Sequence, residues 1–257
     1  MGDTDERQYG RLYPVARAVI KPLFHRLWRI DAEGLEHVPA SGPALICPNH
    51  ISVLDSFFVP AVLPRRITYV GKAEYMDSWK TRYLFPALGM IPLDRSGGSA
   101  SDRALNTAAR VLGRGELFGI YPEGTRSRDG KLHKGHTGAA RLALRANAPL
   151  VPVGIVGTDE IQPPDARYPK LRLPATIRFG RPIPVDRYAE RAGDRLVLRQ
   201  LTDELMYEIR ELSGQEYVDT YATKRAEDVP VERAVIRSEN GGAPVPHTLT
   251  GAMAADG

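Results

Sequence analysis

Apolar runs and amphipathic stretches alternate through the middle of the chain, and this alternation constrains the fold more than any other feature of the sequence. From about residue 44 to 156, short apolar runs are followed by segments with helical spacing. The run PLVPVGIVG at 149–157 is rich in β-branched residues, as expected for a buried parallel strand. The pattern predicts a single α/β domain whose central, mostly parallel or mixed sheet is flanked by helices.

Individual segments follow from the same pattern. We expect whole strands at 44–47 and 149–157, and an edge or late strand at 175–180. We expect shorter strands inside the ranges 67–72, 88–98 and 116–131. We expect helices at 77–88, from Ser101 or Asp102, at 137–146 and at 194–212. Beyond about Lys224 the chain is rich in Pro, Gly and Ala and has no periodicity. Residues 31–223 are therefore expected to form the domain, and 224–257 a disordered tail.

Residues 1–30 are expected to form a basic, amphipathic, membrane-associating segment. A helix at 9–30 would carry a basic stripe and an apolar stripe. The basic stripe consists of Arg17, Lys21, His25 and Arg29. The apolar stripe consists of Leu12, Val15, Val19, Leu23 and Leu27. Tyr13, Phe24 and Trp28 add aromatic bulk, as in helices that lie in a membrane interface. The alternative is a helix packed on the domain core with a solvated basic edge. Pro22 should kink the helix in either case.

Three features point to the cytosolic side of a membrane. No uninterrupted apolar stretch approaches the roughly 18 residues that a spanning helix needs. The first residues, MGDTDERQ, lack the pattern of a signal peptide. The single cysteine, Cys47, excludes an internal disulfide and is expected to be buried and inert. We therefore expect a peripheral protein at the cytoplasmic face of the cell membrane.

A histidine lies where the first predicted strand turns into a helix, in CPNHISVLDSFF at 47–58. His50 precedes Asp55 by five residues, and a helix starting near Ser52 would fold the Asp55 carboxylate back toward the imidazole. One ring nitrogen would then be held and the other left free to accept a proton. The alternative is that Ser52-x-x-Asp55 is only a capping box that satisfies backbone N–H groups.

Loops after other predicted strands carry groups that could bind an anion. Arg95 and Arg126 lie on separate loops and could clamp one phosphate, since ligands collect at the carboxyl ends of parallel strands. Gly124 would allow backbone N–H groups to approach an anion closely. Lys72 and Lys134 are further candidate ligands.

Four blocks in this order resemble the glycerophospholipid acyltransferase family: NHISVLD (49–55), LGMIPLDR (88–95), YPEGTRS (121–127) and PLVPVGIVG (149–157). The resemblance implies a glycerol-3-phosphate acyltransferase-like fold. It also implies acyl transfer from acyl-CoA or acyl-carrier protein to the free hydroxyl of 1-acylglycerol 3-phosphate, giving phosphatidic acid. The donor is a substrate, and we expect no cofactor, no metal and no nucleic-acid partner.

By the same resemblance, His50 is the general base and Asp55 its orienting partner. Glu123, Gly124, Thr125 and Arg126 match the block that engages the acceptor phosphate and shapes the site. Arg95 matches the arginine of the second block. The sequence departs from the family at LHKGHTGAARLA, where an aromatic-Lys-Lys-Gly segment is usual, and at Tyr121, where Phe is common.

Alternatives remain at this point. Glycerol 3-phosphate is the competing acceptor, corresponding to the first acylation step. A non-catalytic protein that binds anionic membrane or nucleic acid would explain the net charge of +4 but not the histidine turn. A metal hydrolase would use His50, Asp55, His133 and His136, although no further ligand spacing supports zinc.

Overall fold

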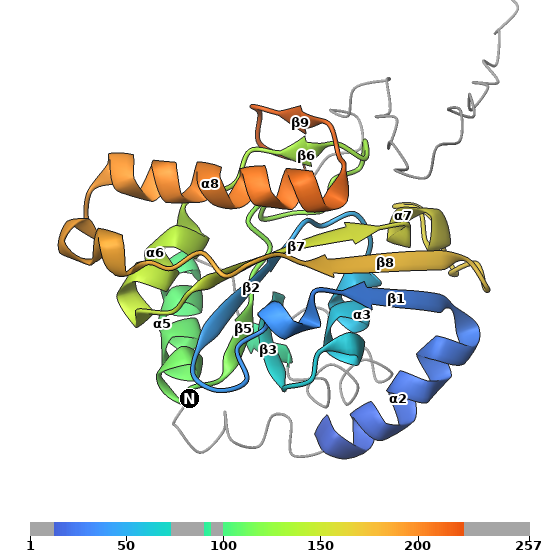
Figure 1. Ribbon diagram of the computed structural model, residues 1–257. Helices are drawn as coiled ribbons and strands as arrows, with labels where there is room; N and C mark the ends of the chain where they lie inside the picture. The colour runs from blue at the N-terminus through green and yellow to red at the C-terminus, as the bar shows by residue number, and fades with distance from the viewer. Residues whose placement is uncertain (1–12, 73–89, 94–99, 224–257) are drawn as a thin grey trace, which may run out of the picture.

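The computed structural model describes residues 13–72, 90–93 and 100–223. A seven-stranded sheet forms its centre, in the order β1-β8-β7-β2-β5-β3-β4 (Figure 1). Its strands are β1 Arg29–Glu33, β2 Ala44–Pro48, β3 Ile67–Lys72, β4 Met90–Leu93, β5 Leu117–Gly119, β7 Leu150–Val156 and β8 Pro174–Phe179. Neighbouring strands are parallel except β7 and β8, which are antiparallel. The predicted mixed, mostly parallel sheet is confirmed.

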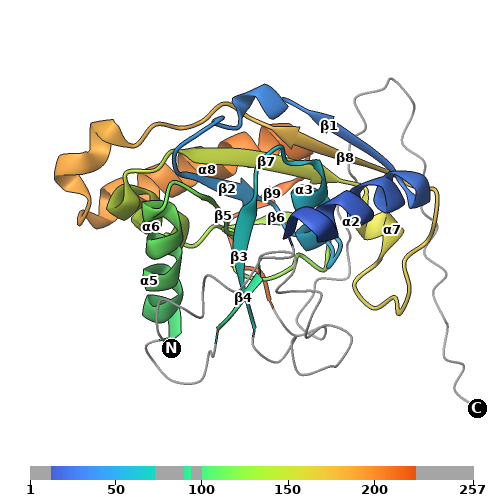
Figure 2. The same ribbon diagram turned by 90° about the horizontal axis from the view of Figure 1, so that it is seen from below.

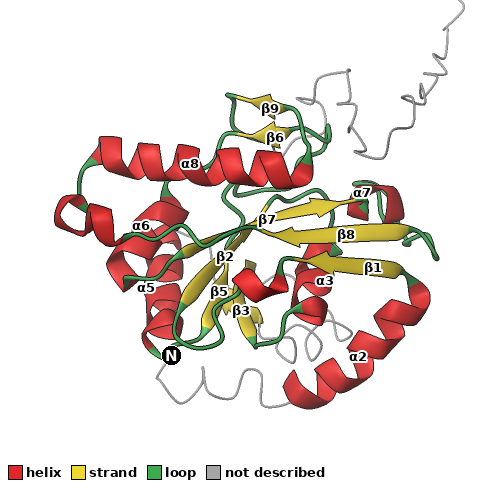
Figure 3. Ribbon diagram, viewed as in Figure 1, coloured by secondary structure: helices red, strands yellow, loops and turns green. Residues whose placement is uncertain are grey.

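Helices cover both faces of this sheet (Figure 3). They are α2 Tyr13–Leu27, α3 Asp55–Val62, α5 Ala100–Gly113, α6 Gly138–Ala146, α7 Thr158–Ile161 and α8 Arg195–Ser213, with 3-10 turns η1 Leu35–His37 and η3 Asp186–Arg191. A second, two-stranded sheet joins β6 Leu132–His133 to β9 Tyr217–Val218. Within the described ranges, no helix is both long and apolar enough to cross a membrane.

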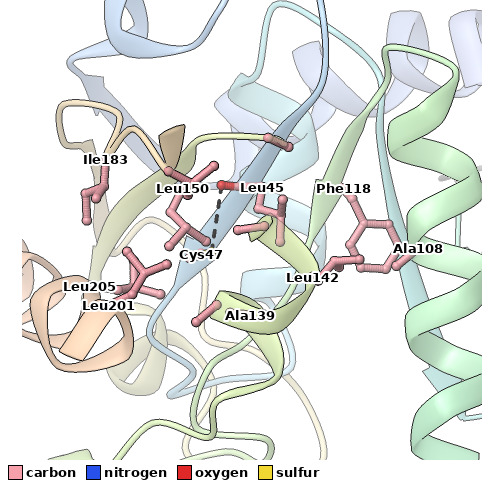
Figure 4. Packing of buried hydrophobic residues seen from close by; sticks show 14 of the residues in the cluster. Leu45, Cys47, Ala108, Phe118, Ala139, Leu142, Leu150, Ile183, Leu201 and Leu205 are labelled. Carbon is pink, nitrogen blue, oxygen red and sulfur yellow. Dashed lines mark hydrogen bonds between the residues drawn. The ribbon is translucent and has the colours of Figure 1, made fainter. Parts of the chain in front are cut away.

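Strand β2 is apolar at every position because both of its faces are buried. Leu45 and Cys47 point into the core formed with α5, α6 and α8, where Leu150 and Leu142 also pack (Figure 4). Ala44 and Ile46 point to the opposite face, into the core with α2 and α3. A strand covered on both faces has no solvent side, so it needs no polar alternation. Cys47 is fully buried, as predicted, and burial raises the pKa of its thiol far above the usual range.

The edge of the sheet differs from the prediction. The strand predicted at 175–180 as an edge or late strand is β8, which is the last strand of the seven in sequence but lies between β1 and β7 rather than at an edge. The edge strand is β1, which the sequence did not reveal because its residues, RIDAE, include only one that is buried, Ile30. The apolar spacing of the preceding helix also ran through to Ile30, whereas α2 ends at Leu27. The predicted helix at 77–88 and the predicted disordered tail lie outside the described residues.

Phe24 of α2, and Trp28 just after the helix, pack on the domain. Phe24 contacts Trp28 and Phe58 edge-on, with ring centroids 5.4 and 5.5 Å apart. The buried Trp28 donates a hydrogen bond from Nε1 to the Lys170 carbonyl oxygen at 2.7 Å. For Phe24 and Trp28, the structure therefore agrees with the alternative interpretation, in which the helix packs on the domain core. Leu23, by contrast, is 46% exposed, so membrane contact by this helix stays a prediction for its outward residues.

The predicted long C-terminal helix is confirmed as α8. Its N-cap is Asp194, whose side chain accepts a hydrogen bond from the Leu196 N–H. Helix α8 lies directly on β7, where a Cβ added to Gly154 would come within 2.4 Å of the Leu212 carbonyl carbon. Only glycine at 154 lets the helix backbone approach so closely. This packing brings the chain that follows α8 to the end of β2, where the candidate site lies.

Candidate active site

His50 and Asp55 face each other across the turn from β2 to α3. His50 Nδ1 lies 2.9 Å from Asp55 Oδ2. The same oxygen accepts hydrogen bonds from the N–H groups of Ile51 and Ser52 at 2.8 and 2.9 Å. Asp55 Oδ1 accepts one from Thr158 Oγ1 at 2.6 Å. Both interpretations of the motif hold, because one carboxylate caps backbone N–H groups and also holds the imidazole. Helix α3 begins at Asp55 itself rather than near Ser52.

The imidazole of His50 is oriented by this carboxylate and by an aromatic ring. Since Asp55 Oδ2 is an acceptor that also takes two backbone N–H bonds, we place the proton of the neutral ring on Nδ1, which leaves Nε2 with its lone pair. Within the described part of the chain, Nε2 has no hydrogen-bond partner, and the side chain is 15% exposed. Tyr121 stacks on the ring with centroids 3.9 Å apart and planes 16° apart. The ring is thus fixed by Asp55 and Tyr121 while Nε2 keeps no partner among the described residues.

Tyr121 is itself held in place as a neutral phenol. Its Oη lies 2.9 Å from Ser56 Oγ. Burial, and then the nearby negative charge of Asp55, raise the pKa of the Tyr121 hydroxyl well above its ordinary value. The Tyr121 ring can therefore support the imidazole without adding a charge beside it.

Asn49 anchors the turn from behind, a role that the sequence analysis missed. Its Oδ1 accepts from the Ile155 N–H at 2.7 Å, and its Nδ2 donates to the Ile155 carbonyl at 2.9 Å. Nδ2 also donates to Gln215 Oε1 at 2.7 Å. Asn49 is fully buried, so these bonds satisfy a group that would otherwise be costly. Its position beside His50 was the available signal, but its partners lie more than 100 residues away in sequence.

Glu123 joins the EGTR loop to the histidine turn. Its Oε1 accepts from the His50 N–H, and its Oε2 accepts from the His133 N–H, both at 3.0 Å. In return, the Ser127 N–H donates to the His50 carbonyl at 2.7 Å. The side chain is buried, and burial raises the pKa of Glu123 to about 8 although the two N–H groups lower it. These contacts favour a positioning role for Glu123, and its direct contact with substrate stays a prediction.

Replacing Glu123 with glutamine tests that positioning role. Either the His50 or the His133 N–H would then face an amide NH₂ instead of an oxygen. An unsatisfied buried donor costs about 1–3 kcal/mol, so we expect kcat to fall on the order of tenfold as the turn shifts. Circular dichroism and kcat measured together check this. The Glu216→Gln control changes a carboxylate that only pairs with Lys131 at the surface, and an equal loss in both variants would contradict the role.

The next residues of the loop offer free donors. Gly124 has a φ of 73°, and its N–H donates to the Tyr121 carbonyl at 3.0 Å. That N–H is therefore taken, and the expectation that Gly124 lets other backbone N–H groups approach an anion closely stays a prediction. The N–H groups and side chains of Thr125 and Arg126 make no hydrogen bond or ion pair within the described residues. These two partly buried residues are the loop's available donors.

The other predicted ligands are placed less favourably. Lys134 Nζ lies 2.8 Å from Asp219 Oδ1, and this hydrogen bond raises the pKa of Lys134. Its ammonium group is thus already paired. Lys72 is in β3, but its side chain lies outside the described part, as does the whole of Arg95. Of the predicted two-arginine clamp, the structure describes the Arg126 half.

A second buried histidine stabilises the segment after the EGTR loop. His133 Nε2 lies 3.0 Å from Asp129 Oδ1, and Nδ1 lies 3.2 Å from the Thr220 carbonyl oxygen. Because both partners are acceptors, only the protonated ring satisfies both. Burial opposes this, but the Asp129 carboxylate raises the pKa of His133. Burial likewise opposes the ionisation of Asp129, whose hydrogen bonds, first from His133, hold its pKa at about 2. Both ring nitrogens of His133 are therefore engaged in contacts that stabilise the fold.

The metal-hydrolase alternative finds no support in the described ranges. His133 is engaged as above, and the ring of His136 stacks on Tyr221 at 4.4 Å. Among residues 13–72, 90–93 and 100–223, no group of three or more His, Cys, Asp or Glu side chains could hold a metal ion.

Comparisons with known proteins identify the family behind this geometry. The family model described as Acyltransferase matches residues 29–156, which include the histidine turn and the EGTR loop. Residues 29–156 belong to the acyltransferase family. The resemblance seen in the sequence blocks is confirmed.

Curated relatives and a solved structure agree with this assignment. The chain is 32% identical over 158 residues to a 1-acyl-sn-glycerol-3-phosphate acyltransferase of Limnanthes douglasii, which covers 61% of this chain and 55% of that protein. It is 31% identical over 126 residues to 1-acyl-sn-glycerol-3-phosphate acyltransferase alpha of Homo sapiens, covering 49% and 44%. A chloroplastic relative from Arabidopsis thaliana is 30% identical over 53% of this chain and 38% of its own length. The chain thus spans between about two fifths and just over half of the length of these relatives.

The fold is shared with a solved acyltransferase. The crystal structure of the 1-acyl-sn-glycerophosphate acyltransferase from Thermotoga maritima superposes with a TM-score of 0.63 at 23% identity, over 82% of this chain and 83% of that chain. The match extends well beyond the segment that the family model covers. It confirms the expected acyltransferase-like fold.

Proposed function

We propose that this protein transfers an acyl group from a thioester to the free hydroxyl of 1-acylglycerol 3-phosphate, giving phosphatidic acid. The observation that carries the proposal is the imidazole of His50, fixed by Asp55 and with no partner for Nε2 among the described residues, beside a loop whose Thr125 and Arg126 donors are available. The family match and the names of the relatives support the reaction class. The donor is acyl-CoA or acyl-carrier protein, and it acts as a substrate rather than a cofactor.

The geometry suggests how the reaction proceeds. His50 Nε2 takes the proton of the acceptor hydroxyl as its oxygen attacks the thioester carbonyl, and Asp55 stabilises the imidazolium that forms. The oxyanion of the tetrahedral intermediate is met by N–H groups of the loop, of which Thr125 and Arg126 are available. The thiolate of the carrier then leaves and takes up the proton from His50. General-base catalysis of this kind contributes about 10²–10⁴-fold.

Arg126 is proposed to hold the acceptor phosphate. Replacing it with alanine should raise the acceptor KM on the order of tenfold or more, because a charge-assisted bond to phosphate is lost. The fold and the donor KM should change little, since the guanidinium makes no bond within the described residues. Steady-state kinetics over a range of acceptor concentrations measure this.

The matched control is Arg128→Ala in the same loop. Arg128 pairs with the exposed Asp165 at 3.1 Å, so its removal changes net charge without touching the proposed phosphate site. If both variants raise the acceptor KM equally, general charge attraction explains the effect and Arg126 is not a ligand.

An acceptor panel tests the proposed function as a whole. Purified protein is given glycerol 3-phosphate, 1-acyl or 2-acyl lysophosphatidate, each with acyl-CoA and with acyl-carrier protein. We expect the 1-acyl acceptor to be preferred. Preference for glycerol 3-phosphate would favour the alternative first acylation, and no product with any pair would leave a non-catalytic binder of anionic membrane or nucleic acid.

The place of action is part of the same proposal. A lipid acceptor is reached most directly by a peripheral protein at the cytoplasmic face of the cell membrane, with anionic lipids as partners. The acid-free, basic stretch that contains α2 supports this attraction. Confocal imaging of the full chain carrying a fluorescent tag, compared with a variant in which the exposed Lys21 and Arg26 are changed to glutamate, would test where it resides.

A further inference from the structure

Two basic segments far apart in the sequence lie side by side in the fold. The first is α2 and the residues after it; no Asp or Glu occurs between Arg7 and Ile30. The second follows α7; no Asp or Glu occurs from Ala166 to Val185. The sequence analysis singled out only the first of them. The figures show the chain between α7 and β8 running beside the end of α2 (Figures 1 and 2).

Hydrogen bonds hold the two segments together. The Arg172 N–H donates to the Leu27 carbonyl at 2.8 Å, and the Arg29 N–H donates to the Leu173 carbonyl at 3.3 Å. Trp28 Nε1 donates to the Lys170 carbonyl at 2.7 Å. The 167–172 loop is therefore fixed against the end of α2, and the two form one surface. We define this loop–helix surface by Leu23, Arg26, Arg167, Tyr168, Lys170 and Leu171.

The loop presents apolar side chains to solvent between its cations. Tyr168 is 72% exposed and Leu171 is 57% exposed, among the largest exposures of any large apolar residue in the described chain. Arg172 adopts a left-handed φ of 63°, which is uncommon for a residue with a side chain. Its N–H bond to Leu27 maintains this turn, which leaves Leu171 outside the core. A fixed turn that exposes leucine and tyrosine among arginine and lysine suits a membrane interface.

The loop–helix surface also connects with the candidate active site. Ser52 Oγ, in the histidine turn, donates to the Gln162 carbonyl at 3.1 Å. The Lys170 N–H donates to the Ile161 carbonyl at 2.8 Å. Val53, next to Ser52, is 40% exposed. A partner bound to this surface would therefore lie close to the turn that carries His50.

We propose that the 167–172 loop is a second membrane-docking element, which inserts Tyr168 and Leu171 into the interface of an anionic bilayer beside α2. The proposal rests on the proposed function, because it supplies a reason for the surface to adjoin the site of a lipid acceptor. Charge complementarity selects an anionic bilayer: Arg26, Arg167 and Lys170 face outward, and each cation near such a surface adds attraction. The exposed apolar side chains distinguish a bilayer from a purely charged polymer such as nucleic acid.

Vesicle sedimentation with the full chain tests the docking. Vesicles of phosphatidylglycerol and phosphatidylcholine are compared with vesicles of phosphatidylcholine alone. Leu171→Glu and Lys170→Glu should each lower the partition coefficient on anionic vesicles on the order of tenfold. The matched controls, Leu196→Glu and Tyr207→Glu, alter residues that are 76% and 56% exposed on α8, on the other face of the sheet. These should bind like the parent chain.

The opposite results would overturn the proposal. Loop variants that bind vesicles as the parent does, or controls that lose as much binding as the loop variants, would remove the loop as a docking element. Equal binding to phosphatidylcholine alone would exclude charge selection. A duplex DNA titration runs in parallel, and weakened DNA binding with unchanged vesicle binding would assign the surface to nucleic acid instead.

Acylation assays separate this proposal from the proposed function. The acceptor is offered either in detergent micelles or in anionic vesicles. Leu171→Glu should keep micellar activity and lose vesicle activity on the order of tenfold, because only delivery at the bilayer is impaired. If the parent chain acylates nothing in either form but the loop variants still lose vesicle binding, the proposed function fails and the docking element stands.

Discussion

Replacing His50 with alanine is expected to abolish measurable turnover while the protein stays folded. The imidazole is the group placed to accept a proton, and general-base catalysis supplies about 10²–10⁴-fold. Its ring is partly exposed and its removal leaves the Asp55 carboxylate with three other donors, from Ile51, Ser52 and Thr158. The turn should therefore survive. Single-turnover acylation and a thermal unfolding curve are the two measurements.

A matched histidine gives the control. His37 is also partly buried, and its Nδ1 lies 2.8 Å from the Phe179 carbonyl oxygen, on another part of the fold. His37→Ala should lower stability by the loss of one hydrogen bond, about 0.5–1.5 kcal/mol, and keep kcat. A folded His50→Ala protein with near-normal kcat would remove His50 as the base.

Replacing Asp55 with asparagine is expected to give the second largest loss, with kcat falling on the order of 10²-fold or more. The amide oxygen can take the place of Oδ2 and keep the N–H bonds of Ile51 and Ser52. The amide NH₂ then faces Thr158, whose hydroxyl can turn to accept. The packing is thus preserved while the negative charge that stabilises the imidazolium is lost. The loss should therefore appear in kcat far more than in the melting temperature.

Thr158→Val separates charge from hydrogen bonding. It removes only the bond to Oδ1 and leaves the Asp55 carboxylate ionised beside His50. We expect a stability loss of about 1–3 kcal/mol for the unsatisfied buried oxygen and a change in kcat smaller than tenfold. If Asp55→Asn and Thr158→Val lower kcat equally, the charge of Asp55 is not what activates the histidine.

The sequence predicted the elements whose physical cause is local. The strand at 149–157 and the helix at 194–212 were recognised because β-branched runs and three-to-four spacing act over neighbouring residues. The pairing of His50 with Asp55 was also predictable because the two residues are close in sequence, although a tight turn before α3, and not a turn of helix, brings the carboxylate back. The structure places these elements almost where the sequence did.

What the sequence missed depends on contacts across the fold. Strand β1 is short and mostly polar, and its identity comes from pairing with β8, about 145 residues later. Lys134 looked like an available ligand, but its partner Asp219 lies on the segment after α8. The sequence did not reveal that both oxygens of Glu123 accept from backbone N–H groups, those of His50 and His133. Such pairings leave no local pattern.

The bonds that Gln215 makes have a consequence for where this enzyme unit ends. Gln215 accepts from Asn49, directly behind the histidine turn, and donates to the Gly130 carbonyl at 2.8 Å beyond the EGTR loop. Gln215, which follows α8, therefore links the histidine turn to the segment after the EGTR loop through hydrogen bonds. The residues that the family model matches, 29–156, therefore stop short of a residue that contacts the histidine turn. A version of the chain that stops before Gln215 would leave one N–H of the buried Asn49 amide without its acceptor, next to His50 in the chain.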